Sequence, residues 1–594
     1  MHIIHFLSGI RKFYFYTKNR QLTPRFFVDQ TNLNWFLGIW FSGVVSLHHI
    51  TLLNKYRNCL QEIFQYLEND MKSLYRCMLV NRTWCRINIA LLWRRPFEYS
   101  GPELTGKYSE LIRTYVTCLH KKSKTDVQSA GYDILDQRPL FHYHKYLKEL
   151  DCDKLGKAIE EWEIRNCYTD YHDEQKNILH TALLKLLLSY CEGLWKLRLG
   201  RYCDKYNFPC ATRFPYIKCN LTNLRKLEVL GDLDCLEEEG LNNFCTFLRN
   251  LSNISNNLEY IDIDTTEDKK SLSGQYLQKL IKSQKNLSFF RYNQECSDIR
   301  KTEEFVEALS HNASTLKNIE FSNLTFNIQC LSPLKKFNNL ECMQFVYCHE
   351  KDISNETEEI IEQTSQLKVK KLIFHKGMLT SVTLEILRLA NISVRELTVD
   401  NVIPDLFKHI YEHCPNITYL ATRISQKNVD SLEYLSASKI EHLILKTLDN
   451  DTNLITKDFS RIGKNLSLYL NHLSLDLNIS AEEFSCLLKE CRSPLESLCL
   501  KFDIKKDSDL ENKDGYLKAV MEFAKENDSL KEFRFSLNNK TNDYSLKNKK
   551  VEDIKAEDIF SKDILEEAKL YIPSILRETK EHFAYINLNS EALL

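Results

Sequence analysis

A short apolar pattern that recurs along the chain is the feature that most limits the folds open to it. From about residue 190 to 536, an L-x-x-L-x-L run repeats with aliphatic or aromatic residues at its three fixed positions. Copies begin roughly 23 to 35 residues apart, in one common frame. The first residues of the clear copies are Leu194, Leu224, Leu258, Leu287, Leu316, Leu340, Val394, Ile440, Leu470, Leu495 and Leu530, and weaker copies start at Val369 and Ile417.

The segments between the copies have helical periodicity, for example residues 241–248 and 381–390. Each unit therefore predicts one short strand followed by a helix, and neither face is buried until neighbouring units stack. The predicted fold class is an α/β solenoid, a leucine-rich-repeat horseshoe with parallel strands on the concave side. A set of ordinary leucine-rich α/β domains is the alternative, and the shared frame of the copies argues against it.

The residues between the second and third apolar positions of each copy are predicted to point to the concave face. They are predicted to be exposed, and five of them are our candidates for substrate binding: Arg198, Glu228, Asp262, Arg291 and Glu320. Gln344, Thr398, Ser474 and Arg534 occupy the same position in later copies. Their mixed charges favour a protein ligand over nucleic acid, which would require a basic stripe.

The rest of the chain divides around the repeats. We separate residues 1–50 as an N-terminal extension, 51–100 as a small helical domain, 101–190 as a helical linker region and 191–537 as the solenoid. In residues 538–594, a charged tract from Asn538 to Asp558 precedes an expected amphipathic helix from Ala556 to Leu576. Because the last repeat needs a cover for its open core, this helix is predicted to be a cap.

Residues 51–100 contain three short helical patterns. Leu60, Ile63, Phe64 and Leu67 follow the i, i+3, i+4, i+7 spacing of one apolar helix face. A second helix around Leu74 follows Asn69-Asp70, and Asn81 is placed to cap a third helix that carries Trp84. So small a core is marginal by itself, so part of this apolar surface is expected to meet a partner or the following helices.

The run Leu-Val-Asn-Arg-x-Trp-Cys from Leu79 and the run Leu-Trp-Arg-x-Pro-Phe from Leu92 resemble an F-box. The likeness is to fungal-type F-box proteins with C-terminal leucine-rich repeats. The resemblance implies docking to the Skp-family adaptor of a cullin-RING (SCF-type) ubiquitin ligase. It implies that eight residues build the F-box core or contact the adaptor: Leu60, Ile63, Phe64, Leu67, Leu74, Val80, Trp84 and Trp93.

One departure from the F-box pattern lies just before the first helix. The family usually opens with Leu-Pro two residues before an acidic position, and Lys55, Tyr56 and Asn58 stand there instead. This weakens the expected adaptor-binding edge. An alternative to a substrate receptor is therefore an interaction scaffold that does not dock to the ligase. A second alternative is an extracellular repeat receptor.

The sequence contains none of the common catalytic motifs. G-x-S-x-G, G-x-x-x-x-G-K-[ST], H-E-x-x-H and G-x-G-x-x-G are absent. The 20 cysteines include no C-x-x-C pair, and Cys203, Cys210 and Cys219 have neither zinc-finger spacing nor a nearby histidine pair. The F-box resemblance implies that the segment with His142 and His144 is structural. We expect no enzyme activity, cofactor or metal, with the cysteines as packed thiols.

Charge and hydropathy give expectations about partners and compartment. The 80 Lys and Arg residues nearly balance 81 Asp and Glu residues, so no overall field favours nucleic acid or a membrane surface. Residues 3–7 are apolar and precede any Lys or Arg, the reverse of a signal peptide, and the apolar run 35–47 is too short to span a bilayer. We expect the cytoplasm or nucleus, where thiols stay reduced.

Overall fold

The computed structural model describes most of the chain in two compact units, Met1–Leu92 and Trp93–Leu594. The described residues are 59–98, 107–132, 134, 138–166, 173–200, 209–231, 236–265, 272–296, 298–351, 367–377, 379–447, 456–477, 479–502, 510–537 and 560–577. The N-terminal extension, the charged tract and Lys55, Tyr56 and Asn58 lie outside them.

The first unit is a small helical core. Residues 59–65 form a helix, and α4 (Met71–Met78) and α5 (Arg82–Leu92) follow it. The Asp70 carboxylate caps α4 by accepting a hydrogen bond from the Ser73 amide at 3.0 Å. The Asn81 side chain accepts one from the Trp84 amide at 2.9 Å, which confirms the predicted cap of the third helix.

The described residues of the second unit form one 16-stranded sheet in which neighbouring strands pair in parallel. Its strands pair in chain order except β8, which pairs with β6. The strands are β1 (Glu149–Asp151), β2 (Lys196–Leu199), β3 (Lys226–Gly231), β4 (Tyr260–Thr265), β5 (Phe289–Cys296), β6 (Asn318–Phe326), β7 (Cys342–Val346), β8 (His349–Glu350), β9 (Lys371–His375), β10 (Glu396–Val399), β11 (Tyr419–Arg423), β12 (His442–Lys446), β13 (His472–Asp476), β14 (Ser497–Phe502), β15 (Glu532–Leu537) and β16 (Ser574–Arg577).

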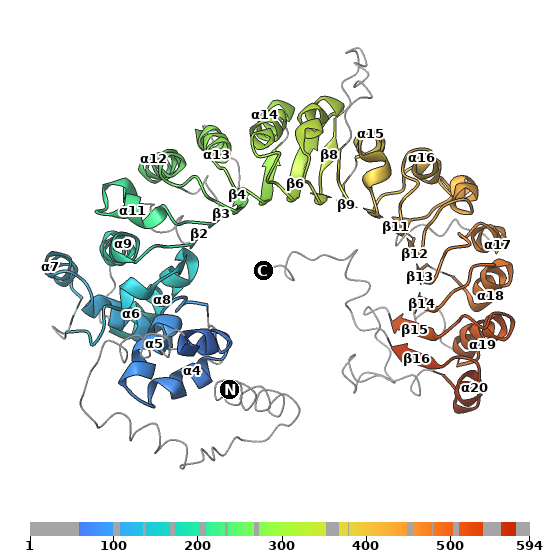
Figure 1. Cartoon of the computed structure of the whole chain (residues 1–594), viewed down its shortest axis with the longest axis horizontal. Coiled ribbons are helices and arrows are strands. Elements are labelled where there is room, and N and C mark those ends of the chain that lie inside the picture. Colours follow the sequence, from blue (N-terminus) through green and yellow to red (C-terminus); the bar gives the residue numbers. More distant parts are fainter. Residues whose placement is uncertain are drawn as a thin grey trace, which may run out of the picture. The chain divides into compact units, whose positions relative to one another are not determined.

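Helices cover one face of this sheet and leave the other on the inner side of its curve (Figure 1). They are α6 (Lys107–Thr117), α7 (Lys121–Ser129), α8 (Cys152–Asn166), α9 (Asp173–Tyr190), α11 (Ile217–Leu221), α12 (Glu238–Ile254), α13 (Leu272–Lys282), α14 (Ile299–Ser310), α15 (Thr380–Ala390), α16 (Leu406–His413), α17 (Thr456–Lys464), α18 (Ala481–Glu490), α19 (Leu510–Glu526) and α20 (Lys562–Ala568). The 3-10 helices are η2 (Tyr143–Tyr146), η3 (Ala211–Arg213), η5 (Ile328–Lys336), η6 (Asn391–Ser393) and η7 (Asp430–Leu435).

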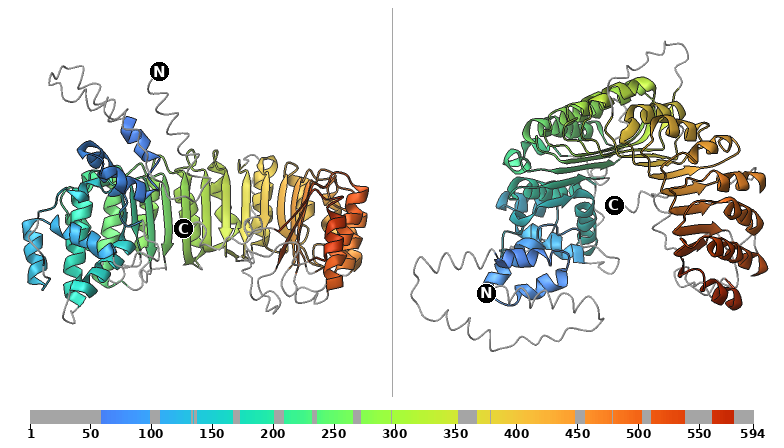
Figure 2. Two further views of the ribbon diagram at one scale, coloured as in Figure 1. Left: turned by 90° about the horizontal axis from the view of Figure 1, so that it is seen from below. Right: turned by 45° about the vertical axis from the view of Figure 1, so that its right-hand side comes forward.

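The repeated leucine pattern explains this arrangement. In β2, β3 and β4 the second apolar positions Leu197, Leu227 and Ile261 are paired in register and fully buried. Because side chains alternate across a strand, the residue after each of them points to the opposite face. The neighbouring strands stand side by side along the sheet (Figure 2). The predicted alternation of strands and helices is confirmed, and the fold is consistent with a solenoid.

The sheet extends beyond the predicted repeats at both ends. Strand β1 lies within residues 101–190, which we expected to be helical, and pairs with β2. The single helix expected from Ala556 to Leu576 is wrong, because α20 covers only Lys562–Ala568 and β16 pairs with β15. Pro573 explains the break, since proline lacks the amide that an α-helix needs and favours extended backbone before it.

Within the described part of the chain, no helix is both long and apolar enough to cross a bilayer.

Candidate adaptor-docking segment and inner sheet face

The core of the first unit contains most of the residues that the F-box resemblance singled out. Leu60, Phe64 and Leu74 are buried together with Ile87. The partly buried side chains of Ile63, Leu67 and Trp84 pack against this cluster. Phe64 and Trp84 meet edge to face, with ring centroids 4.9 Å apart.

Several large apolar side chains of the first unit remain exposed instead. Val80 is 58% exposed and the adjacent Leu79 is 72% exposed. Tyr66 and Tyr75 are exposed as well. Of the eight predicted residues, Val80 is thus the one that is open to a partner, while Leu60, Phe64 and Leu74 hold the core. Exposed apolar side chains concentrated in so small a unit are typical of an interaction surface.

Trp93 stands at the boundary between the two units. It belongs to the second unit and packs against that unit's core. Its ring centroid lies 5.3 Å from that of Tyr115 and 4.3 Å from that of Tyr143. The F-box resemblance implied that Trp93 builds the F-box core or contacts the adaptor, and its side chain packs against the core of the second unit instead of the small helical core.

Six charged residues form a row across the inner face of the sheet, from β1 to β6. Register pairing aligns Asp151, Arg198, Glu228, Asp262, Arg291 and Glu320. We call these six residues the charged row. It contains all five candidates for substrate binding, on neighbouring strands as the pattern predicted.

Ion pairs link the members of the charged row. Arg198 lies between Asp151, with Nε 3.9 Å from the Asp151 Oδ2, and Glu228, with Nη1 3.6 Å from the Glu228 Oε2. Arg291 similarly lies between Asp262, at 3.8 Å, and Glu320, at 3.3 Å. Lys196, two residues before Arg198, adds an ion pair of 2.6 Å to Glu228.

The charged row is far more buried than we expected. Glu228 is 8% exposed and Asp262 is 6% exposed, and the Oδ1 atom of Asp262 has no hydrogen-bond partner. The assumption that these are solvated positions with small effects on stability is therefore wrong. Neighbouring strands bring long side chains close enough to cover one another, which a single repeat does not reveal.

Burial strongly affects the titration of the Asp262 carboxyl group. Burial, reinforced by the nearby carboxylates of Glu228, Asp264 and Glu320 and opposed by Arg291, raises the pKa of Asp262 to about 6. The unfolded value is near 3.9, so between these two pH values the folded protein binds more protons than the unfolded chain. The folded state therefore loses stability as the pH rises through this window.

Replacing Asp262 by asparagine should remove this loss. We expect the Asp262→Asn protein to melt at a higher temperature than the wild type at pH 7.5, by the equivalent of about 2 kcal/mol, and at the same temperature near pH 4. Differential scanning calorimetry of both proteins across this range measures the effect. Asp430→Asn, at a side chain that is 82% exposed, is the control. A pH-independent difference would contradict the assignment.

Later positions of the same register row are less charged. Gln344 is followed by Ile373, Thr398, Ala421 and Ile444 on successive paired strands. Ala421 and Ile444 form a small buried cluster with the partly buried Tyr419. Ser474, Cys499 and Arg534 continue the row through β15. This register row thus changes from charged side chains at β1–β6 to uncharged ones at β9–β12.

An aromatic pair on the same face was missed by the sequence analysis. Tyr260 and Phe289 are aligned on β4 and β5, are both partly exposed, and stack with ring centroids 4.4 Å apart. The Lys226 ammonium lies 5.5 Å from the Tyr260 ring and 5.5 Å from the Trp195 ring. Tyr260 and Phe289 lie two residues before Asp262 and Arg291 of the charged row, so strand alternation predicts that they share its face. Aromatic side chains in such positions are typical of protein-binding hot spots.

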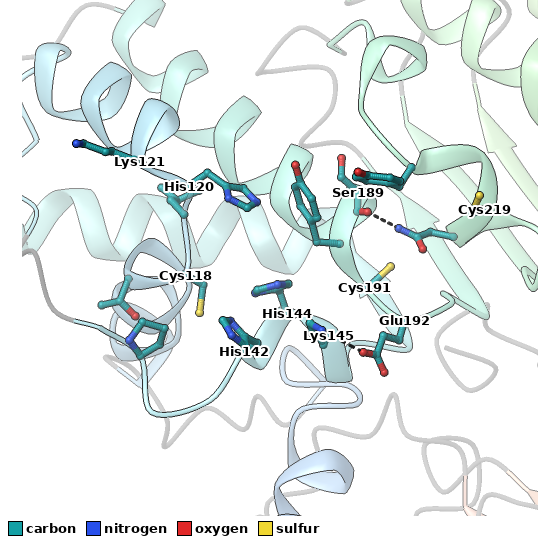
Figure 3. A pocket seen from close by; sticks show the side chains of 16 residues that line it. Cys118, His120, Lys121, His142, His144, Lys145, Ser189, Cys191, Glu192 and Cys219 are labelled. Carbon is teal, nitrogen blue, oxygen red and sulfur yellow. Dashed lines mark hydrogen bonds and ion pairs between the residues drawn. The ribbon is translucent and has the colours of Figure 1, made fainter.

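A cavity of about 650 Å³ lies beside the C-terminal end of α9 (Figure 3). His120, His142 and His144 line it together with Tyr190 and Cys191. Burial, with a smaller effect of His142, lowers the pKa of His144 to about 4. Burial also raises the pKa of Cys191 to about 11, so this thiol stays protonated near neutral pH and is a poor nucleophile.

The cysteine cluster noted in the sequence is only partly described. Cys210 and Cys219 are free thiols, and Cys203 lies outside the described residues. The Cys210 sulfur lies 3.5 Å from the Thr212 hydroxyl. Burial raises the pKa of Cys330, Cys348 and Cys414 to about 12 in each case, which fits packed thiols in apolar surroundings.

Comparison with known families identifies one part of the chain. Residues 58–99 match the F-box-like family. The chain matches no curated protein. The match covers the described helices of the first unit and the first residues of the second. F-box domains typically bind Skp-family adaptors, and proteins that carry them are typically substrate adaptors and not enzymes, so this domain suggests an adaptor role in an SCF-type ubiquitin ligase in general.

Proposed function

We propose that this chain is the substrate-recognition subunit of an SCF-type E3 ubiquitin ligase. The F-box-like domain docks to a Skp-family adaptor and through it to a cullin, and the second unit, a leucine-rich-repeat horseshoe, binds a protein substrate. The F-box-like match at residues 58–99 carries this proposal, and the folded core around Phe64 supports it. Ubiquitin transfer is catalysed by conjugating machinery that the complex brings close to the substrate.

The docking surface that we propose consists of Tyr66, Tyr75, Leu79 and Val80. These side chains are exposed although they are large and apolar, which costs solubility unless a partner covers them. The core residues Leu60, Phe64 and Leu74 act indirectly, because they hold the helices that present this surface.

The substrate surface that we propose is centred on the Tyr260–Phe289 pair and bordered by the charged row. The stacked rings supply apolar area that is rigid and partly exposed. The charged row supplies pre-positioned carboxylates and guanidinium groups that select a partner by charge complementarity. Both signs are present, so the substrate is a folded protein or peptide with mixed charge.

Replacing Tyr260 and Phe289 together by alanine should prevent substrate turnover without preventing adaptor binding. In cells that lack the endogenous protein, substrates accumulate, and quantitative proteomics identifies those that the wild type returns to low abundance. The Tyr260→Ala/Phe289→Ala protein is expected to leave them high, because loss of a hot spot costs at least about 2 kcal/mol, or roughly thirtyfold in affinity. Tyr469→Ala, at an exposed tyrosine outside the strands, is the control. Full rescue by the double variant would contradict the inner-face site.

A further inference from the structure

Helix α16 carries two histidines and a glutamate on one side. The sequence His409-Ile410-Tyr411-Glu412-His413 has the order H-x-x-E-H, whereas the sequence analysis tested only H-E-x-x-H. Residues four apart on a helix lie on the same face, one turn above the other, and residues three apart are their neighbours. His409 therefore faces both Glu412 and His413.

The geometry of the three side chains suits a metal ion. Each offers one ligand atom, and these three atoms lie within 4.8 Å of one another. The two imidazole rings have centroids 5.6 Å apart and are inclined by 36°. Among the described residues, no other group of three His, Cys, Asp or Glu side chains meets this distance criterion.

The environment of His409 provides a second, independent observation. Its Nδ1 atom is buried and has no hydrogen-bond partner, which is costly for a polar atom unless a ligand or ion binds it. Neutral imidazole is the form that binds metals.

We propose that His409, Glu412 and His413 bind a divalent transition-metal ion, for which zinc is the best candidate. Two imidazoles and one carboxylate are the ligands of a borderline-soft cation, whereas Mg²⁺ and Ca²⁺ prefer oxygen ligands alone. Zinc–nitrogen bonds are about 2.0–2.1 Å long, so the side chains must close in slightly on binding. Since Glu412 is exposed and the histidines are partly exposed, this movement disturbs no core packing.

Three protein ligands leave at least one coordination position open. Water or a side chain of a bound protein can fill it. Helix α16 lies in the helical layer that covers the outer face of the sheet (Figure 1), so the site is separate from the charged row on the inner face. The second unit would then have a metal-dependent surface in addition to the proposed substrate surface.

Histidine modification read by mass spectrometry tests the site residue by residue. The full-length chain, stripped of metal, is treated with diethylpyrocarbonate in the presence of Zn²⁺ or Mg²⁺. Zinc should slow modification of His409 and His413 at least about tenfold, the ratio expected when over nine-tenths of the sites are occupied. Magnesium should have no effect. His311, an exposed histidine at the end of α14, should react equally in both. This readout is insensitive to zinc bound by cysteines elsewhere.

The variant His413→Ala makes the test specific to the cluster. Alanine favours the helical conformation, so we expect α16 to stay folded and His409 to remain as the reporter. Circular dichroism checks that the variant has the secondary-structure content of the wild type. Zinc should no longer protect His409 in this variant, and Glu412→Gln should weaken the protection. Unprotected histidines in the wild type would overturn the proposal, and so would zinc protection of His409 that persists in His413→Ala.

Discussion

Replacing Leu79 and Val80 together by aspartate is expected to abolish binding of a Skp-family adaptor and leave the chain folded. Both side chains are largely exposed, so the substitutions should change the stability of the first unit by no more than about 0.5 kcal/mol each. In the complex, burial of each side chain is expected to contribute roughly 1.5 kcal/mol or more to the free energy of binding. Losing both contributions should weaken the affinity at least about 100-fold. Surface plasmon resonance with purified adaptor measures the loss.

A matched variant separates docking from folding in this experiment. Leu140→Asp changes another exposed leucine, outside the F-box-like match, and should bind the adaptor normally. Leu60→Asp should also lose binding, but by unfolding the first unit, because Leu60 is only 3% exposed. Wild-type affinity of the Leu79→Asp/Val80→Asp protein would show that the adaptor binds a different surface.

Charge reversal at Arg291 is expected to destabilise the second unit strongly. A glutamate there would lie between Asp262 and Glu320, three carboxylates on adjacent strands, at a side chain that is only 16% exposed in the wild type. Removing one partner of a buried ion pair costs about 3–5 kcal/mol, and the reversal adds repulsion. Urea unfolding of the full-length chain, followed by tryptophan fluorescence, should show a midpoint well below that of the wild type.

A charge swap identifies the cause of that loss. The double variant Arg291→Glu/Glu320→Arg restores opposite charges on β5 and β6 and should recover part of the stability, whereas Arg300→Glu, at a side chain that is 87% exposed, should have almost no effect. If Arg291→Glu unfolds at the wild-type midpoint, the charged row is solvated and our description of its burial is wrong.

Much of the architecture follows from local sequence patterns. The copies that begin at Leu194, Leu224 and Leu258 predicted strands that the structure contains as β2, β3 and β4. The common frame of the copies also predicted which side chains align across strands. Side chains alternate between the two faces of a strand, so burying the leucines on one face fixes the face of every other residue. The first helix of the F-box-like domain was predicted in part from its apolar spacing, but it ends at Gln65, before Leu67.

The properties that depend on distant residues were not predictable in this way. The burial of Glu228 arises from Lys196 and Arg198, about thirty positions earlier, which only the stacking of strands brings close. Trp93 resembled an F-box residue by its position, but it packs on Tyr143. Strand β16 could not be predicted, because the four residues Ser574–Arg577 are too few to show whether their apolar pattern is that of a strand or of a helix end.

Co-purification of the full-length chain with a Skp-family adaptor tests the central proposal most directly. The two proteins are co-expressed, the adaptor is captured through a tag, and size-exclusion chromatography with multi-angle light scattering gives the composition of the complex. We predict a stable equimolar complex that forms with the wild type and is lost in Leu79→Asp/Val80→Asp. A chain that folds yet elutes without the adaptor, while a known F-box protein binds the same preparation, would contradict the account and favour a repeat scaffold without ligase docking.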